Sequence, residues 1–339
     1  MSWDVFIRAL PLPRSLVACI YVLFPAQTRS CPSFFYSSLY IFLCLQFFCS
    51  IVQLLSATMY SLSTIASCAA LLSTALAIPA PQMPGFTQTW VENFAGTTVN
   101  LANWEYWSAT PSNGEQEIYP TNGANCHITP SNTLQILPDN SGGQWTSCRI
   151  ETNEAFVANA TNGLKMLVQA SLKVGVPGVT ASQLQGIWPA FWSLGEGVKH
   201  NVAWPACGEI DTFENVDGAT VGHATLHCGA ACNDASFVGI GSQVPFNFGT
   251  FHTWAHEVDL TSSDWTAQTI TFFLDGTAYR DIRGSDVGDL TAWTALTGPM
   301  MVTLNVAVGG QWPGPAGSST ATGVTAGMEV QYVAVYHSN

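Results

Sequence analysis

The chain has 339 residues, of which 47% are hydrophobic and only 9% are charged, and its formal net charge is −13. This excess of negative charge argues against nucleic acids and anionic polymers as ligands, because like charges repel. The length is sufficient for one large β domain or for two smaller domains.

The N-terminal region carries almost no charge, and no charged residue occurs between Arg29 and Glu92. In one interpretation translation begins at Met59, and residues 59–77 form a secretory signal peptide that ends in a small-residue cleavage pattern. Residues 1–58 would then be an artefact of an over-extended gene model. We favour this interpretation.

A second interpretation of the same region remains open. Residues 33–57 are 25 uncharged residues, which is long enough for a membrane anchor. Three arginines before them would keep the N-terminus in the cytosol. Both interpretations place residues 78–339, which we expect to form a single domain, outside the cytosol.

From Ile78 onward the chain has six basic and 21 acidic residues, a net charge of −15. This composition is typical of a secreted soluble protein with a neutral ligand. Residues 78–84 are rich in proline and predict an extended leader that does not pack. Asn159-Ala160-Thr161 is the one glycosylation sequon.

Five cysteines follow the leader, and disulfides are the default for an exported protein. We predict one disulfide between Cys126 and Cys148, across a hairpin, and another between Cys228 and Cys232, which closes a small loop. Cys207 is left as a buried thiol. The cysteines and histidines show no metal-ligand spacing, so we expect no metal site.

Nearly every segment after the leader has a β pattern. Residues 164–170 and 269–274 alternate, and Asp275-Gly276 after the second run is a hairpin signal. Residues 299–308 and 330–336 form two apolar runs. Many strands without long helices predict an all-β sandwich or barrel.

Two tryptophans, Trp188 and Trp192, are four residues apart, so on a strand they share a face. Flat indole rings suit the apolar face of a sugar ring, and their N–H groups can reach hydroxyls. Packing in the core is the alternative interpretation.

Three carboxylates lie close together in an apolar segment. Alternation places Glu209 and Asp211 on one face of a strand, whereas Glu214 is out of phase by one residue. A β-bulge at Thr212-Phe213 would return Glu214 to that face. An exposed acidic edge strand is the alternative, but Phe213 is a poor choice for an exposed position.

The predicted spacing suits a known chemistry. With the bulge, the two Glu Cα atoms lie roughly 13 Å apart, and inward-leaning side chains leave a carboxyl gap of about 5 Å. That gap is expected of a glycosidase that retains anomeric configuration, in which Glu209 attacks the sugar and Glu214 transfers the proton. Asp211 between them would set the charge of its neighbours.

This motif, Glu209-Ile210-Asp211-x-x-Glu214, resembles the signature of glycoside hydrolase family 16 in its bulged, laminarinase-like form, as in fungal endo-β-glucanases. The resemblance covers residues 93–336. It implies a concanavalin A-like jelly roll, a sandwich of two curved antiparallel sheets with the sugar cleft on the concave face.

The resemblance also implies substrate-binding residues outside the motif. Trp188 and Trp192 fall in a segment similar to the substrate-binding strand of the family, and Arg149 in a segment that places an arginine at the cleft. An ion pair with a surface acid is the alternative role of Arg149. His227 would touch a sugar on the leaving side, although a structural role is the alternative. The block that ends in Trp312 would bring this indole to the cleft rim.

The sequence departs from the family pattern in the last strand. Gln331 stands near the place of an acid that often binds calcium in the family, so we expect no structural calcium. Thr212 and Phe213 replace a more usual aliphatic pair.

We therefore predict a secreted, retaining endo-β-glucanase that acts on β-1,3- or mixed β-1,3/1,4-glucan. It needs no cofactor, because carboxylates supply both the proton transfer and the covalent intermediate. The expected partner is the polysaccharide, with no nucleic acid, with a membrane only if the anchor is real, and with the chain as a monomer. A cell-wall transglycosylase and a non-catalytic lectin-like domain are the alternatives.

Overall fold

The computed structural model describes residues 77–108, 113–234 and 238–339. The expected N-terminal extension, membrane anchor and signal peptide lie outside the described residues, except for Ala77. Within the described ranges, no helix is both long and apolar enough to cross a membrane.

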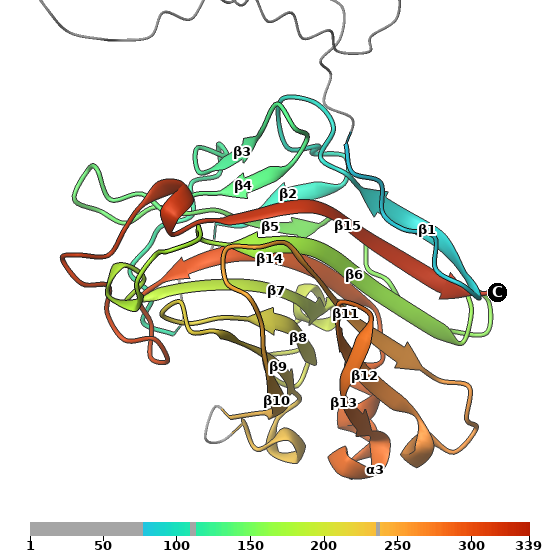
Figure 1. Ribbon diagram of the computed structural model, residues 1–339. Helices are drawn as coiled ribbons and strands as arrows, with labels where there is room; N and C mark the ends of the chain where they lie inside the picture. The colour runs from blue at the N-terminus through green and yellow to red at the C-terminus, as the bar shows by residue number, and fades with distance from the viewer. Residues whose placement is uncertain (1–76, 109–112, 235–237) are drawn as a thin grey trace, which may run out of the picture. The chain divides into compact units, whose positions relative to one another are not determined.

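The described residues form two antiparallel sheets, which curve in the same sense (Figure 1). The first sheet has eight strands, with β1 (Phe86–Glu92) paired to the strand β15. The others are, in spatial order, β13 (Thr277–Arg283), β12 (Thr269–Leu274), β11 (His252–Asp259), β6 (Lys165–Val174), β15 (Met328–Ser338), β4 (Leu134–Ile136) and β3 (Cys126–Ile128).

The second sheet has seven strands and packs against the first. In spatial order these are β10 (Ile240–Pro245), β9 (Val221–His227), β8 (Glu209–Glu214), β7 (Ile187–Gly195), β14 (Met300–Val308), β5 (Arg149–Thr152) and β2 (Trp104–Tyr106). The helices are short: η1 (Ala181–Gln183), η2 (Glu196–His200), η3 (Ala230–Cys232), η5 (Trp265–Ala267), α3 (Gly284–Val287), α4 (Leu290–Leu296) and η6 (Gly323–Thr325). The predicted all-β sandwich is confirmed.

The core lies between the two sheets. Phe213 of β8 packs against Trp254 of β11 with their ring centroids 4.5 Å apart, and both side chains are fully buried. Thr212, also in this core, forms a 2.7 Å hydrogen bond with His256 Nδ1, so its hydroxyl has the partner that a buried polar group needs. Burial lowers the pKa of His256 to about 3, and the ring is therefore neutral.

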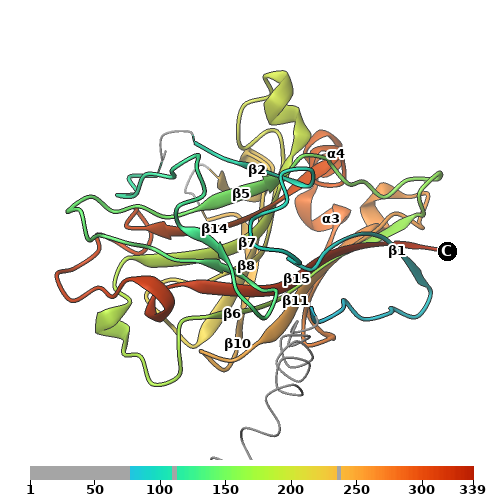
Figure 2. The ribbon, with the colours of Figure 1, turned by 90° about the horizontal axis from the view of Figure 1, so that it is seen from above.

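One expectation about the leader was wrong. Ala80 is buried against the outer face of the first sheet, and the Tyr336 hydroxyl donates a 2.8 Å hydrogen bond to the Pro81 carbonyl. A proline-rich segment cannot continue a sheet, but here it covers apolar and tyrosine side chains that would otherwise be exposed. Strand β6, which lies beside β15 in the first sheet (Figure 2), is buried on both faces, and Leu167 on its outer face belongs to the same apolar cluster as Ala80.

Both predicted disulfides and the free buried Cys207 are confirmed. Cys126, however, lies in β3 of the first sheet, and Cys148 directly precedes β5 of the second. The bridge therefore joins the two sheets rather than crossing a hairpin. The hairpin at Asp275-Gly276 is confirmed between β12 and β13, and both residues have the positive φ that such a turn requires (50° and 75°).

Candidate active site

A cavity of about 380 Å³ opens on the outer face of the seven-stranded sheet. Its lining alternates along four strands, as expected for one face of a sheet. These strand residues are Arg149 on β5; Trp188, Ala190, Trp192 and Leu194 on β7; Glu209, Asp211 and Glu214 on β8; and Asn305 and Ala307 on β14. Glu209, Asp211 and Glu214 thus share one face, and so do Trp188 and Trp192, as the sequence predicted.

The strand register shows the bulge that makes this possible. Asp211 pairs with Thr225 and Glu214 with His223, so β8 uses one more residue than β9 over the same length. Two consecutive side chains, Thr212 and Phe213, both point into the core. Glu214 therefore returns to the cavity face, and the predicted bulge is confirmed.

A glycine fixes where β8 begins. Gly208 has a φ of +83°, and a Cβ on it would lie 2.7 Å from the backbone carbonyl of Ala295 in α4. Only glycine meets both conditions without a shift of the backbone. Glu209, the next residue, is thereby held where the strand enters the cavity.

Each of the two glutamates accepts a hydrogen bond from an indole N–H. Trp188 Nε1 donates to Glu214 Oε1 at 2.8 Å, and Trp204 donates to Glu209. The aromatic rings remove water from the carboxylates while their N–H groups satisfy one oxygen each. The two hydrogen bonds therefore hold both glutamate side chains in a fixed orientation.

Burial dominates the electrostatics of the three carboxylates. It raises the pKa of Glu209 to about 8, an effect that the charge of Glu214 increases and that Arg149 opposes. It raises the pKa of Glu214 to about 7 against the hydrogen bond from Trp188, and it raises that of Asp211 well above the ordinary value. The three groups therefore hold shared protons near neutral pH and titrate as a unit.

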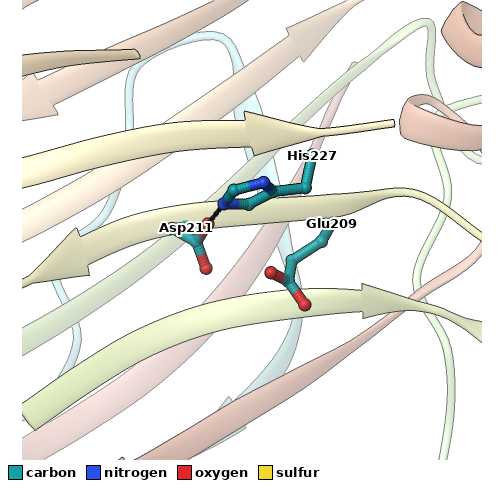
Figure 3. A group of neighbouring side chains, drawn as sticks. All are labelled: Glu209, Asp211 and His227. Atoms are coloured by element: carbon teal, nitrogen blue, oxygen red, sulfur yellow. Dashed lines mark ion pairs between the residues drawn. The ribbon is translucent and has the colours of Figure 1, made fainter. Parts of the chain in front are cut away.

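Figure 3 shows Glu209, Asp211 and His227 turned toward one another from the neighbouring strands β8 and β9. His227 Nε2 lies 3.5 Å from Asp211 Oδ2, and His227 Nδ1 lies 2.6 Å from Asp234 Oδ1. His227 is not among the residues that line the cavity; on β9 it pairs with Glu209, and its ring lies beside Asp211. The expected contact with a leaving-side sugar stays a prediction.

The sequence predicted no metal site, yet the fold groups potential ligands. Oxygen and nitrogen atoms of Glu209, Asp211 and His227 all lie within 4.8 Å of one another, the one such group of three in the described part of the chain. The spacing pattern could not reveal it, because His227 comes from the next strand. Gln331, at the expected place of a calcium ligand, instead accepts a 2.7 Å hydrogen bond from the Ser171 hydroxyl.

Arg149 lies between two indole rings. Its guanidinium carbon is 3.8 Å from the ring centroid of Trp107 and 4.4 Å from that of Trp192. Burial lowers its pKa, and nearby negative groups, Glu209 among them, oppose this. The arginine is therefore a cavity residue, as predicted, and also an ion-pair partner of a buried acid, Glu151, at 3.6 Å.

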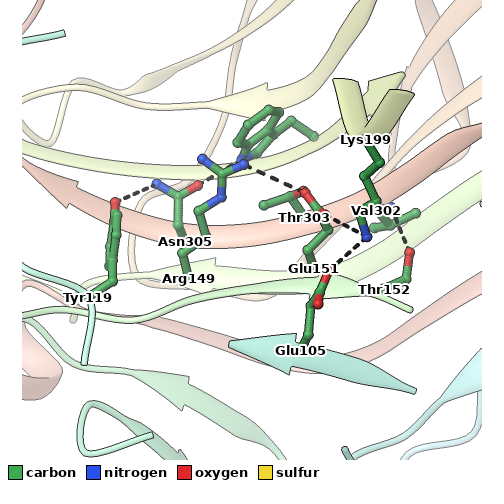
Figure 4. A network of polar contacts seen from close by, with 10 residues as sticks. Glu105, Tyr119, Arg149, Glu151, Thr152, Lys199, Val302, Thr303 and Asn305 are labelled. Carbon is green, nitrogen blue, oxygen red and sulfur yellow. Dashed lines mark hydrogen bonds and ion pairs between the residues drawn. The ribbon is translucent and has the colours of Figure 1, made fainter. Parts of the chain in front are cut away.

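A polar network holds this arginine (Figure 4). Glu151 lies between Arg149 and Lys199, whose Nζ is 3.3 Å from Glu151 Oε1 and 2.7 Å from Glu105 Oε1. Buried charges need such partners. The network ties β2, β5 and η2 together beside the cavity.

Beside this network, Asn305 accepts a 2.8 Å hydrogen bond from Trp192 Nε1 and donates one of 3.2 Å to the Tyr119 hydroxyl (Figure 4). Asn305 therefore fixes the edge of the Trp192 ring, and the Arg149 guanidinium packs on its face. A preformed ring is what a binding site for a flat, rigid ligand requires.

Trp312 is not among the residues that line the cavity but contacts Trp188, which does, so its expected place at the cleft rim stays a prediction. Its side chain is 45% exposed, and it contacts Trp188 edge-on with centroids 5.5 Å apart and His223 at 5.0 Å. Trp188 is thereby fixed from its outer side while its N–H is bonded to Glu214.

Several cavity residues were missed by the sequence analysis. Trp204 stands at the start of the carboxylate segment, and Asn305 is the one amide in an apolar run. The sequence could therefore have indicated both as site residues. Four others come from irregular segments earlier in the chain that only the tertiary fold brings to the sheet: Trp107, Asn113, Glu115 and Tyr119. Ala190, Leu194, Val198 and Ala307, which complete the lining, carried no signal of their own.

Comparison with known proteins shows what the chain is similar to. The family description "XgeA-like, catalytic GH16 domain" matches residues 143–250, which include the three carboxylates. The crystal structure of an endo-1,3-β-glucanase from Streptomyces sioyaensis is similar with a TM-score of 0.69 and 34% sequence identity. That match covers 77% of this chain and 100% of the other.

Two curated relatives are also similar in sequence. A keratan-sulfate endo-1,4-β-galactosidase from Sphingobacterium multivorum is 29% identical over 53% of this chain, and a glucan endo-1,3-β-glucosidase A1 from Niallia circulans is 25% identical over 76%. The chain spans only 40% and 38% of the lengths of these two relatives. These similarities do not show the source of this chain, so the expected fungal source stays a prediction.

Proposed function

The chain belongs to glycoside hydrolase family 16, and on that premise we propose that it is a secreted, retaining endo-β-glucanase acting on β-1,3- or mixed β-1,3/1,4-glucan. One observation carries the proposal: the bulge in β8 brings Glu209, Asp211 and Glu214 to one face, inside a cavity lined by indole rings. The similarity to an endo-1,3-β-glucanase supports the choice of substrate.

The proposed reaction has two steps. In the first, the carboxylate of Glu209 attacks the anomeric carbon while Glu214 gives its proton to the glycosidic oxygen, and the leaving sugar departs with a new hydroxyl. In the second, Glu214 takes a proton from water, and the water oxygen displaces Glu209 from the sugar. Two inversions give net retention, and no cofactor is required.

The assignment of roles rests on contacts rather than on the order of pKa values. Burial raises the pKa of both glutamates, which suits a proton donor but not a nucleophile. Because the group titrates as a unit, the raised pKa values do not decide which residue holds the proton during the reaction. The positive charge of Arg149 and the Trp204 N–H act on Glu209 and stabilise an anion there.

A neutral glucan fits the cavity better than a sulfated polymer. Although one relative is a keratan-sulfate endo-1,4-β-galactosidase, Arg149 is the only cation that lines the described cavity, and its guanidinium faces are covered by indoles. The chain is also strongly acidic, which repels polyanions. The crowded carboxylates likewise disfavour a lectin, which has no use for them.

The remaining expectations on processing and assembly are part of the proposal. We propose cleavage of a signal peptide after Ala77, export of residues 78–339 as a monomeric single-domain glycoprotein, and glycosylation at Asn159. Two disulfides suit an oxidising compartment, and Asn159 lies in a surface turn closed by mutual backbone hydrogen bonds with Gly163. N-terminal sequencing of secreted material should begin near Ile78; membrane-bound material that retains residues before Met59 would contradict this.

The activity is tested with purified enzyme on laminarin, lichenan and a 1,4-linked glucan, with the products sized over time. We expect short oligosaccharides from the first two substrates, released at first as the β-anomer in an NMR assay. The transglycosylase alternative predicts instead longer products when an oligosaccharide acceptor is added. Binding of these glucans without any cleavage would favour the lectin alternative.

A further inference from the structure

The bulge in β8 contains one extra residue, and the strand register identifies it as Thr212. Toward β7 the paired residues of β8 on either side of it are Asp211 and Phe213, and toward β9 they are Asp211 and Glu214. Thr212 thus has no register partner on either neighbouring strand. Pairing between strands leaves such an extra residue unpaired, so other contacts have to fix its place.

Both core-facing side chains of the bulge contact the strand β11 of the opposite sheet. Thr212 Oγ1 lies 2.7 Å from His256 Nδ1, and the ring centroid of Phe213 lies 4.5 Å from that of Trp254. Trp254 and His256 are two residues apart on β11, so they share its inner face. The bulge is therefore held at two neighbouring points on a single strand.

His256 is a fixed and fully buried anchor for Thr212. It pairs in register with Val168 on β6 and with Phe272 on β12, so its strand is held on both sides. Within the described ranges its Nε2 makes no hydrogen bond, and Thr212 is thus the one polar partner of the ring. Moving Thr212 away would leave two buried polar groups unsatisfied, which disfavours any other place for the bulge.

The place of the extra residue decides which way Glu214 points. Without the bulge, strict alternation would turn Phe213 toward the cavity and Glu214 into the core. Phe213 secures the bulge only by apolar packing, which is less directional than a hydrogen bond. A fully satisfied polar pair, in contrast, specifies one arrangement of a core.

We propose that Thr212 and His256 are positioning residues, whose hydrogen bond across the sandwich fixes the bulge at Thr212 and so holds Glu214 at its working distance from Glu209. The inference rests on the proposed glycosidase function. It adds to that function two residues that do not line the cavity and never touch the substrate.

The test compares Thr212→Val, which keeps the shape and removes the hydroxyl, with Thr212→Ser, which keeps the hydroxyl. Thr133→Val is the matched control. Thr133 is also a buried threonine, and its hydroxyl donates a 2.7 Å hydrogen bond to Glu329 Oε1, but it lies directly before β4 in the other sheet. The control therefore loses a buried hydroxyl of the same kind without touching the bulge.

For Thr212→Val we expect kcat on laminarin to fall by about ten- to a hundredfold, because a small displacement of a reacting group is costly. KM should change little, since the indoles that line the cavity keep their places. Thr212→Ser and Thr133→Val should stay within about threefold of the wild-type kcat. A wild-type kcat in Thr212→Val, or an equal loss in either of the other two variants, would overturn the proposal.

A double variant separates positioning from stability. Thr212→Val combined with His256→Leu leaves neither partner buried and unsatisfied, so the midpoint of denaturant unfolding should return toward that of the wild type. We expect kcat to remain at least about fivefold below the wild-type value, because an apolar pair stabilises the core without specifying the place of the extra residue. Recovery of kcat together with stability would overturn the proposal.

Hydrogen–deuterium exchange provides a readout that needs no substrate. The backbone amides of residues 209–214 should exchange faster in Thr212→Val than in the wild type, and at the wild-type rate in Thr133→Val, because a loosened bulge opens more often. Equal exchange in all three proteins would overturn the proposal. Failure of the wild type to cleave any β-glucan would instead refute the proposed function, and the exchange rates would still decide whether the pair holds the bulge.

Discussion

Replacing Trp188 with Phe removes one hydrogen bond from the site and keeps an aromatic ring in place. In the native enzyme the indole N–H donates to Glu214 Oε1 at 2.8 Å and so favours the ionised form of this acid. Without this hydrogen bond the neutral form of Glu214 becomes more stable relative to the ionised form, and the pKa of Glu214 rises above its value of about 7. The acid then keeps its proton to higher pH.

The magnitude follows from the strength of such a bond. A hydrogen bond to a charged acceptor contributes about 1.5–3 kcal/mol, and one pKa unit corresponds to about 1.4 kcal/mol. Water can replace part of the lost bond, so we expect the basic limb of the kcat/KM profile to move up by roughly one unit. Initial rates on laminarin across the pH range measure it.

Trp192→Phe is the matched control for this experiment. Trp192 lies on the same face of β7, but its N–H donates to Asn305 rather than to a carboxylate. Its loss should weaken substrate binding without moving the basic limb. If Trp188→Phe leaves the limb in place or moves it down, or if both variants move it equally, the reasoning about the indole and Glu214 is refuted.

Three further predictions concern stability and thiol chemistry. Because the pKa of Glu214 is raised to about 7 in the fold, its contribution to stability is present at acid pH and lost as pH rises through that value. The thermal unfolding temperature of Glu214→Gln should therefore depend less on pH between about 5 and 8 than that of the wild type. An unchanged pH dependence would contradict this. Replacing Cys126 and Cys148, 22 residues apart, with Ser should lower the free energy of unfolding by about 3 kcal/mol in denaturant titrations; a loss below about 1 kcal/mol would count against the bridge as a constraint. The buried Cys207, whose pKa burial raises to about 11, should resist alkylation until the protein is denatured, and rapid labelling of the native enzyme would show that the thiol is accessible.

Much of the fold could be predicted because local patterns carried it. The alternation in residues 269–274, the Asp275-Gly276 turn and the apolar run of β14 each specify their own structure, and all were found. The bulge in β8 could be predicted because a bulge is the simplest way to bring Glu214 into phase with Glu209. The pairing of the cysteines was also correct, although its setting between the sheets was not.

What could not be predicted depends on segments that are distant in sequence. The Pro-rich leader gave no sign of the tyrosines that it covers on β15. Trp107, on one side of the Arg149 guanidinium, comes from an irregular segment, and nothing near it in the sequence indicates its partner. Asp234 follows the loop that the Cys228–Cys232 disulfide closes, and in the sequence the four-residue spacing of these cysteines indicated only a small loop.

The central claim is that Glu209 is the nucleophile and Glu214 the acid and base, and azide rescue tests it most directly. With an aryl β-glucan oligosaccharide, which needs little protonation of its leaving group, Glu214→Ala should still form the covalent intermediate. Azide should then attack this intermediate and give a β-glycosyl azide. In Glu209→Ala, azide replaces the nucleophile and should give the α-glycosyl azide. The opposite pair of products would reverse the two roles, and full activity of both variants on natural β-glucan would show that this segment is not the active site.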